Sequence, residues 1–244
     1  MRIQSSSGNV YAGEQDILLA PVKCHPENYP VVFCHGAEGS PGADAWMGLP
    51  TRWGSFNAVI DEGGATGFSS DLGGSATWGN DLVVSRMDSA FNFAQTLGQI
   101  AGKVILVAQS MGAATAIAWA SANSSKVARI VLVIPVLNIL DIRDNSAYAN
   151  DINAAYGGLY VEATHGLNHS PLTIAQSDKL SSIPILMFYG DVDTLCKPVY
   201  AQQFAEAAGQ CRAYSMSGGH AETTVAMVPE NILSEFISKG VLPA

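Results

Sequence analysis

Basic residues are scarce in this chain. Lys and Arg number 12 against 21 Asp and Glu, which gives a formal net charge of −9 over 244 residues. The basic residues are scattered along the sequence, so they form no cluster that could follow a phosphate backbone. The composition therefore predicts that nucleic acid is not a partner.

Long apolar runs are also missing. No stretch reaches the roughly 18 apolar residues that a membrane-spanning helix needs. Residues 1–17, MRIQSSSGNVYAGEQDI, contain one Arg and no apolar segment, which is unlike a conventional signal peptide. We expect no transmembrane segment and no conventional signal peptide.

Cysteine is rare and lacks diagnostic spacing. The four cysteines, Cys24, Cys34, Cys196 and Cys211, do not occur in the closely spaced pairs of a zinc site and are too few for a disulfide scaffold. Cys34 lies in an apolar stretch, which predicts a buried thiol. Cys196 and Cys211 flank one predicted helix, and the sequence leaves open whether they form a disulfide.

Signatures of cofactors and metals are not found. The Gly-rich stretch 61–78 has neither G-x-G-x-x-G nor G-x-x-x-x-G-K-[ST], so nothing supports phosphate binding. There is no H-E-x-x-H motif, and His165 and His169 lie in a segment predicted to be loop-like. We expect no cofactor and no metal, and a loss of activity in chelator would contradict this.

What the sequence does contain is an alternation of apolar strands and helices. The predicted strands are 14–20, 29–35, 56–60, a stretch from 103, 128–136, 183–189 and 211–216. The predicted helices are 43–53, 80–100, a stretch from about 111, 198–208 and 229–238. Residues 1–9 are predicted to be a flexible lead-in and 61–78 a long irregular loop. The alternation predicts a single α/β domain over 1–244, with a mostly parallel central sheet flanked by helices.

Residues from about 136 to 182 interrupt the alternation. They contain Tyr148, Tyr156, Tyr160 and the two histidines, and no long buried strand. We expect a small cap insertion over the edge of the sheet. Its tyrosines and histidines could line a pocket or lie on the surface, and the sequence does not decide between the two.

The most informative stretch is Lys103 to Trp119, KVILVAQSMGAATAIAW. It combines an apolar strand, a sharp turn carrying Ser110 and an alanine-rich helix, the arrangement that raises a serine hydroxyl at the end of a buried sheet. Small residues are needed at 108 and 112, because larger side chains would collide with neighbouring elements. The start of the helix also directs unsatisfied N–H groups toward a developing oxyanion.

Three further motifs follow predicted strands. His35-Gly36-Ala37-Glu38-Gly39 is a Gly-rich loop that would let a backbone N–H approach an acyl oxygen, with His35 supporting the loop. Gly190-Asp191-Val192-Asp193 follows the strand 183–189, and Ser217-Gly218-Gly219-His220 follows the last strand. Serine, acid and histidine therefore occur in that order at strand ends.

These four motifs in this order resemble the α/β-hydrolase superfamily over 14–238. The resemblance implies that Ser110 is the nucleophile, His220 the general base and acid, and Asp193 the residue that orients the imidazole. It also implies that the backbone N–H groups of Ala37 and Met111 form the oxyanion hole. Asp191 is expected to hydrogen-bond the loop, and Asp141 is the alternative acid because some members place the acid one strand earlier.

The A-x-S-M-G turn and the modest cap resemble serine esterases and lipases. This implies hydrolysis of a small or polymeric carboxylic ester through an acyl-enzyme. A thioesterase, acyltransferase or peptidase on the same residues remains an alternative. The segments 71–74 and 77–80, DLGG and TWGN, resemble loops of hydrolase-like proteins of actinobacterial phages, some of them tail-associated. As a further alternative, this resemblance implies a domain that binds a surface polymer and has secondary esterase activity. It leaves a cytoplasmic and a virion-associated location both open.

Overall fold

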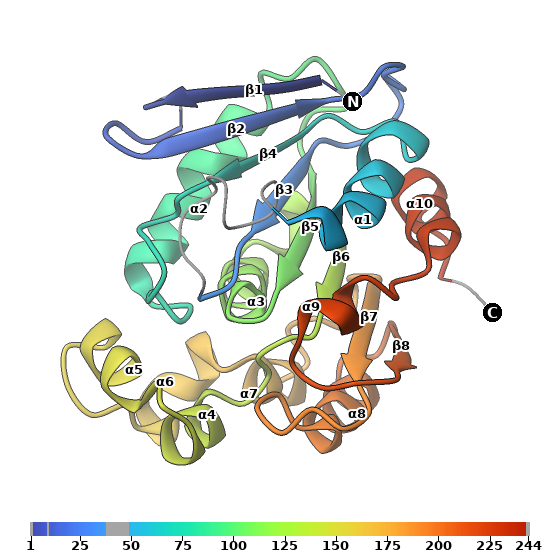
Figure 1. The fold of residues 1–244 in the computed structure, drawn as a ribbon. Coiled ribbons are helices and arrows are strands. Elements are labelled where there is room, and N and C mark those ends of the chain that lie inside the picture. Colours follow the sequence, from blue (N-terminus) through green and yellow to red (C-terminus); the bar gives the residue numbers. More distant parts are fainter. Residues whose placement is uncertain (1, 9, 38–48, 243–244) are drawn as a thin grey trace.

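The central element of the fold is an eight-stranded sheet. The computed structural model describes residues 2–8, 10–37 and 49–242. The strands follow the order β1-β2-β4-β3-β5-β6-β7-β8 across the sheet (Figure 1). Their bounds are β1 Arg2–Ser7, β2 Gln15–Ala20, β3 Val31–Cys34, β4 Gly67–Ser70, β5 Val104–Gln109, β6 Val127–Val133, β7 Ile185–Gly190 and β8 Cys211–Met216.

Only the β1–β2–β4 end of the sheet is antiparallel. β1 pairs antiparallel with β2, and β2 with β4, whereas every other neighbouring pair is parallel. The carboxyl ends of the parallel strands meet at one edge of the sheet, which is where open α/β sheets bind ligands. The predicted mostly parallel α/β architecture is confirmed.

Helices cover both faces of the sheet. Alternate residues of β5 illustrate this, because Leu106 and Ala108 pack into one apolar core while Ile105 and Val107 pack into the other. The first core is covered mainly by α2 Asp81–Ala94, α3 Gly112–Ala122, α7 Pro171–Gln176 and α8 Pro198–Ala207. The second is covered by α1 Trp53–Asn57, the π-helix η2 Ala58–Glu62 and α10 Glu230–Lys239. Burial on both faces explains the largely apolar, non-alternating sequences of β3, β5, β6 and β7.

The strand predicted over 56–60 is wrong. These residues belong to α1 and η2, which pack on the sheet instead of joining it. Phe56, Val59 and Ile60 are all buried, and a short apolar run fits a buried helix as well as a buried strand. β3 pairs with β5 on one side and with β4 on the other, and β4 lies inside the stretch 61–78 that was predicted to be irregular.

Two predictions at segment boundaries also fail. Residues 2–7, expected to be flexible, form the edge strand β1 against β2. The helix predicted to reach residue 100 ends at Ala94, because the Thr96 hydroxyl donates to the Phe93 carbonyl (2.7 Å) and Gly98 takes a left-handed φ of 74°. The helix predicted over 43–53 falls largely on 38–48, outside the described residues, and Pro50–Arg52 form a 3₁₀ turn, η1.

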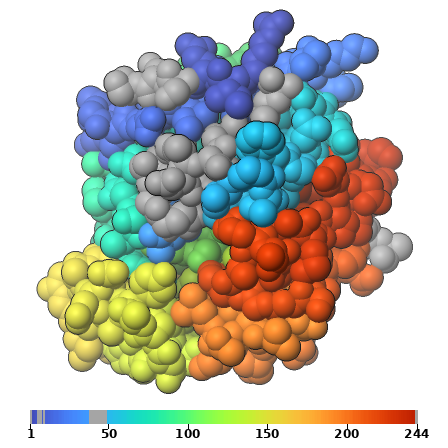
Figure 2. Space-filling model, viewed as in Figure 1, coloured from blue at the N-terminus to red at the C-terminus, as the bar shows by residue number. Residues whose placement is uncertain are grey.

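Four short helices lie between β6 and β7. They are α4 Ile139–Asn145, α5 Ala149–Ala155, α6 Glu162–His169 and α7. Three of them, α4 to α6, form a lobe below the sheet in Figure 1, and Figure 2 shows this lobe beside the C-terminal segment. Ile139, Ile142, Ile152 and Tyr160 of this region share a third apolar cluster with Met111, next to the serine turn.

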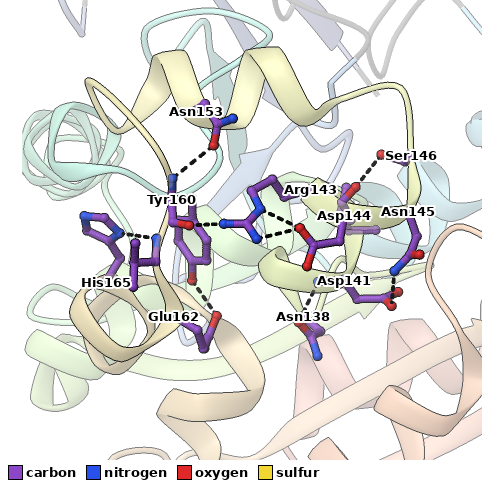
Figure 3. Close-up of polar contacts among 12 residues, drawn as sticks. Asn138, Asp141, Arg143, Asp144, Asn145, Ser146, Asn153, Tyr160, Glu162 and His165 are labelled. Carbon is purple, nitrogen blue, oxygen red and sulfur yellow. Dashed lines mark hydrogen bonds and ion pairs between the residues drawn. The ribbon is translucent and has the colours of Figure 1, made fainter.

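Polar contacts fix this helical insertion internally (Figure 3). Asn138 caps α4 by accepting from the Asp141 N–H (2.9 Å), and the Arg143 guanidinium bonds the Tyr160 carbonyl. The Tyr160 hydroxyl donates to Glu162 (2.8 Å). His165 and His169 lie on helix α6, so the prediction that they occupy a loop is wrong.

Candidate active site

The serine turn is built by the main chain. Ser110 follows β5 directly and has a φ of 50°, in the left-handed region that non-glycine residues rarely adopt. Two hydrogen bonds hold it there: its N–H donates to the Val133 carbonyl (3.1 Å), and its carbonyl accepts from the Val136 N–H (3.0 Å). The turn therefore has little freedom to relax.

Close packing explains the small residue at 112. A side chain at Gly112 would overlap the main-chain carbonyls of Cys34 and His35, at the end of β3. The expected collision at this position is confirmed. Ala108 is also fully buried, in β5 between β3 and β6.

The side chains of Ser110, His220 and Asp193 are connected by hydrogen bonds. The Ser110 Oγ lies 2.9 Å from His220 Nε2, and His220 Nδ1 lies 2.9 Å from Asp193 Oδ2. With a proton on Nδ1 donated to the carboxylate, Nε2 can accept from the serine hydroxyl. The Asp193 side chain is fully buried, while 20% of the His220 side chain is exposed. The buried Asp193 carboxylate thus sets the tautomer of His220, whose partly exposed ring lines a cavity.

Asp193 is held in position by the turn after β7. Its Oδ1 accepts from the N–H groups of Leu195 (2.9 Å) and Cys196 (2.8 Å), which leaves Oδ2 for the imidazole. Asp141, the alternative acid, accepts from the Lys197 ammonium instead (2.6 Å). Asp141 therefore belongs to a neighbouring ion pair, and its described hydrogen bonds do not include His220.

Side-chain contacts hold the loop that carries His220. Asp191 Oδ1 accepts from the Gly218 N–H (2.8 Å), as expected from the sequence, and the Thr224 hydroxyl donates to the Gly219 carbonyl (2.8 Å). Gly218 has a φ of 141°, which favours glycine. The loop thus depends on β7 and on the short helix α9 Glu222–Val225 for its position.

The predicted oxyanion residues lie at the same edge of the sheet. Met111 directly precedes helix α3, and Ala37 lines a cavity of about 300 Å³ together with Ser110 and His220. His35 supports this loop, because its Nδ1 and Nε2 lie 2.8 and 2.7 Å from the carbonyl oxygens of Gly36 and Asp71. Glu38 and Gly39 of the Gly-rich motif lie outside the described residues.

One wall of the cavity carries an ion pair that the sequence analysis missed. Arg52 Nε and Nη2 donate to the two carboxylate oxygens of Glu222 at 3.0 and 2.5 Å, and the Thr51 hydroxyl donates to Oε2 (3.1 Å). Burial raises the pKa of Glu222, but the bonds and charge of Arg52, with Thr51 and Gln109, outweigh it and lower that pKa overall. Because Glu222 lies two residues after His220, the sequence could have indicated that it is near the site. Nothing in the sequence indicates its partner Arg52, which lies 170 residues away from it.

Cys196 lies beside the histidine and its acid. Ligand atoms of Asp193, Cys196 and His220 lie within 4.8 Å of one another, a spacing that a metal ion could use. Burial, with the charges of Asp193 and Asp141, raises the pKa of the Cys196 thiol well above its ordinary value, so it is protonated at neutral pH. Metal binding requires a thiolate, and both Asp193 oxygens already accept hydrogen bonds, so these residues fit a hydrogen-bonded network better than a metal site.

All four cysteines are free thiols. Cys196 and Cys211 form no disulfide, which settles the pairing that the sequence left open. The thiol of Cys34 is buried as predicted, and burial raises its pKa to about 12. Among the described residues, no helix is long and apolar enough to cross a bilayer.

The fold is that of an α/β-hydrolase. A sequence profile of the serine hydrolase family matches residues 85–226, more than half of the 244-residue chain. The chain therefore belongs to the serine hydrolase family. The profile spans β5, the serine turn, Asp193 and His220.

Solved structures of esterases share the fold. Est1E from Butyrivibrio proteoclasticus superimposes with a TM-score of 0.65 at 13% identity, covering 93% of this chain and 92% of that one. An S-formylglutathione hydrolase from Agrobacterium tumefaciens gives 0.67 at 11% identity, covering 96% and 91%. The esterase domain of a Rhodothermus marinus protein gives 0.64 at 17% identity, covering 96% and 98%. No curated protein sequence matches this chain significantly, and these comparisons give no support to the phage resemblance.

Proposed function

We propose that this protein hydrolyses carboxylic esters through an acyl-enzyme, with Ser110, His220 and Asp193 as the catalytic residues. The observation that carries the proposal is the continuous pair of 2.9 Å contacts from the Ser110 hydroxyl through the imidazole to the Asp193 carboxylate. A serine hydroxyl is barely ionised at neutral pH, so attack on a carbonyl needs a base at this distance.

The reaction follows from this arrangement. His220 Nε2 takes the Ser110 proton as Oγ attacks the acyl carbon, and the imidazolium is stabilised by the buried Asp193. The same nitrogen returns the proton to the leaving alcohol, and water then repeats the sequence to release the acid. The backbone N–H groups of Ala37 and Met111 stabilise the oxyanion, a contribution worth about 3 kcal/mol per donor in comparable sites.

We also propose that the insertion between β6 and β7 acts as the cap of the cleft. Tyr148, at the start of α5, lines the cavity that holds Ser110. Its ring contacts Trp78 with a centroid separation of 5.0 Å, which joins the insertion to the segment after β4. A cap of this kind excludes water from one side of the cavity.

Removal of the nucleophile tests the catalytic assignment. Ser110→Ala should lower the turnover of p-nitrophenyl butyrate by about 10⁶-fold and abolish labelling by a fluorophosphonate probe. The control is Ser125→Ala, which changes an exposed serine and should leave both readouts unchanged. Wild-type protein that is unlabelled and no faster than Ser110→Ala would end the proposal. Thioesters and amides of butyrate in the same assay test the alternative substrates.

A further inference from the structure

A hydrogen-bonded cluster of four side chains is centred on the Glu222 carboxylate in the wall of the cavity. Glu222 accepts two hydrogen bonds from Arg52, one from Thr51 and one from Gln109. We call these four residues the carboxylate cluster. A carboxylate offers about four acceptor positions, so Glu222 has none left for a substrate. Its role therefore lies in the contacts that it makes within the protein.

The carboxylate cluster joins three segments that are distant in the sequence. Two of its members belong to η1, Gln109 is the last residue of β5, and Glu222 is the first residue of α9. Gln109 directly precedes Ser110, and Glu222 lies two residues after His220. The cluster thus connects the chain beside the candidate nucleophile to the chain beside the candidate base, in addition to the 2.9 Å contact between those two side chains.

The Gln109 amide is oriented by the charge of Glu222. Gln109 is 3% exposed, and its Oε1 has no hydrogen-bond partner in the part of the chain that the structure describes. A buried amide oxygen without a donor is unfavourable. Turning the amide over would place that oxygen against the carboxylate, which repels it. The bond to Glu222 therefore determines how the side chain next to Ser110 lies.

The buried Arg52 keeps Glu222 at η1. The Arg52 side chain is only 2% exposed, and its Nε and Nη2 donate to the two oxygens of the carboxylate. A guanidinium does not lose its proton in a protein, so at this burial it requires a paired anion. The Glu222 side chain is consequently held in the wall, although 34% of it is exposed.

Helix α9 carries this restraint to the histidine loop. The Gly219 carbonyl, next to His220, accepts from the Thr224 hydroxyl (2.8 Å) and from the Ala221 N–H (3.0 Å). The loop and the start of α9 are therefore one unit. Asp193 bonds the imidazole ring from the β7 side, whereas the carboxylate cluster fixes the main chain of the loop from the η1 and β5 side.

We infer that Glu222 is a positioning residue for the reaction: through Arg52 and Gln109 it holds α9 so that His220 Nε2 stays within reach of the Ser110 hydroxyl. This inference rests on the proposed function and adds a residue to the same site. Displacement of a catalytic group by about 1 Å costs roughly 100-fold in rate. Because Glu222 has no acceptor position left for the substrate, its loss should lower kcat and leave KM nearly unchanged.

Removing the whole ion pair separates positioning from stability. The double variant Arg52→Met, Glu222→Met leaves no unpaired buried charge, so its Tm should stay within about 5 °C of wild type. Its kcat with p-nitrophenyl butyrate should fall by about 10- to 100-fold, with KM changed by less than about threefold. The control, Glu235→Met with Lys239→Met, removes an exposed ion pair of α10 and should change neither constant. A folded double variant with the kcat of wild type would overturn the inference, and so would a loss carried by KM alone.

A single variant tests the connection to the serine turn and leaves the ion pair in place. Gln109→Met keeps the length of the side chain and removes the amide, and it should lower kcat by about 3- to 10-fold at nearly constant KM. A kcat equal to that of wild type would overturn the inference, because α9 would then be positioned without the end of β5. Labelling of wild-type protein by a fluorophosphonate shows separately that the proposed function holds, so the two failures are distinguishable.

Discussion

The serine turn and the histidine loop meet at one hydrogen bond but are held by different means. The turn at Ser110 is fixed by main-chain hydrogen bonds and by the close approach of Gly112 to the Cys34 carbonyl. The loop at His220 is fixed by the side chains of Asp191, Thr224 and Glu222. The position of Ser110 therefore depends on the packing of the core, whereas the position of His220 depends on a few individual side chains.

Among the variants that compare the two sides, Asp193→Asn should have the largest effect on activity, and it should act on the histidine side alone. The amide can offer an N–H to His220 Nδ1, which favours the tautomer with the proton on Nε2 and prevents proton transfer from Ser110. We expect kcat to fall by about 10⁴-fold near neutral pH. Steady-state kinetics with p-nitrophenyl butyrate measure it. Asp141→Asn is the control, and a larger loss in that variant would transfer the role of acid to Asp141.

Gly112→Ala should damage the serine side through the core. The added methyl group meets main-chain carbonyls that cannot move aside, so we expect a destabilisation of about 3 kcal/mol and a Tm lower by roughly 6–12 °C. Gly158→Ala is the matched control, because no atom lies within 4 Å of a Cβ at that position. Thermal unfolding of both variants provides the comparison. Equal Tm values would show that the turn is not held by packing.

Asp191→Ala should affect activity without affecting the core. Loss of the bond to the Gly218 N–H frees the histidine loop, and a misplacement of this kind costs about 10- to 100-fold in rate. The Tm should change by less than it does in Gly112→Ala. The exposed Asp151→Ala variant is the control, measured by the same kinetics and unfolding. A rate equal to wild type would mean that other contacts suffice to hold the loop.

Thiol labelling should reveal the smallest difference between the two sides. Burial raises the pKa of Cys34, beside the serine turn, to about 12, and that of Cys196, beside His220, well above its ordinary value. Thiolate is the reactive form, so iodoacetamide at pH 8 should modify the exposed Cys24 and spare both. In Asp191→Ala protein, Cys196 should become reactive before Cys34, as mass spectrometry of the labelled peptides can determine. Simultaneous labelling would contradict the comparison.

Much of the sheet could be predicted because its strands are buried on both faces. β3 and β7 carry no charged residue, β5 is apolar up to Gln109, and β6 is apolar except for Arg129. The order of the serine, acid and histidine motifs at strand ends was likewise visible. The geometric relation among these three side chains is not itself a sequence property, and the assignment of their roles remains a proposal.

The rest of the sheet depends on tertiary packing. β4 reads Gly-Phe-Ser-Ser, a sequence with little strand propensity. Its Gly67 is required because a Cβ there would lie 2.8 Å from Ile60 and from Phe33. The apolar run at 56–60 looked like the missing strand, but it forms the helix against which Gly67 packs. That 67–70 is a strand and that 56–60 is helical both depend on the contact between these two segments, which the sequence alone does not show.

The contact between Gly112 and the end of β3 has a consequence for how this protein can change. The segment that carries Ala37 leaves β3 within three residues of the Cys34 carbonyl on which the serine turn rests. A shift of that strand end therefore moves the two candidate oxyanion donors together with Ser110, the candidate nucleophile. Substitutions elsewhere in the cavity wall can therefore change which substrate the protein accepts, while Ser110, Ala37 and Met111 keep their relative positions.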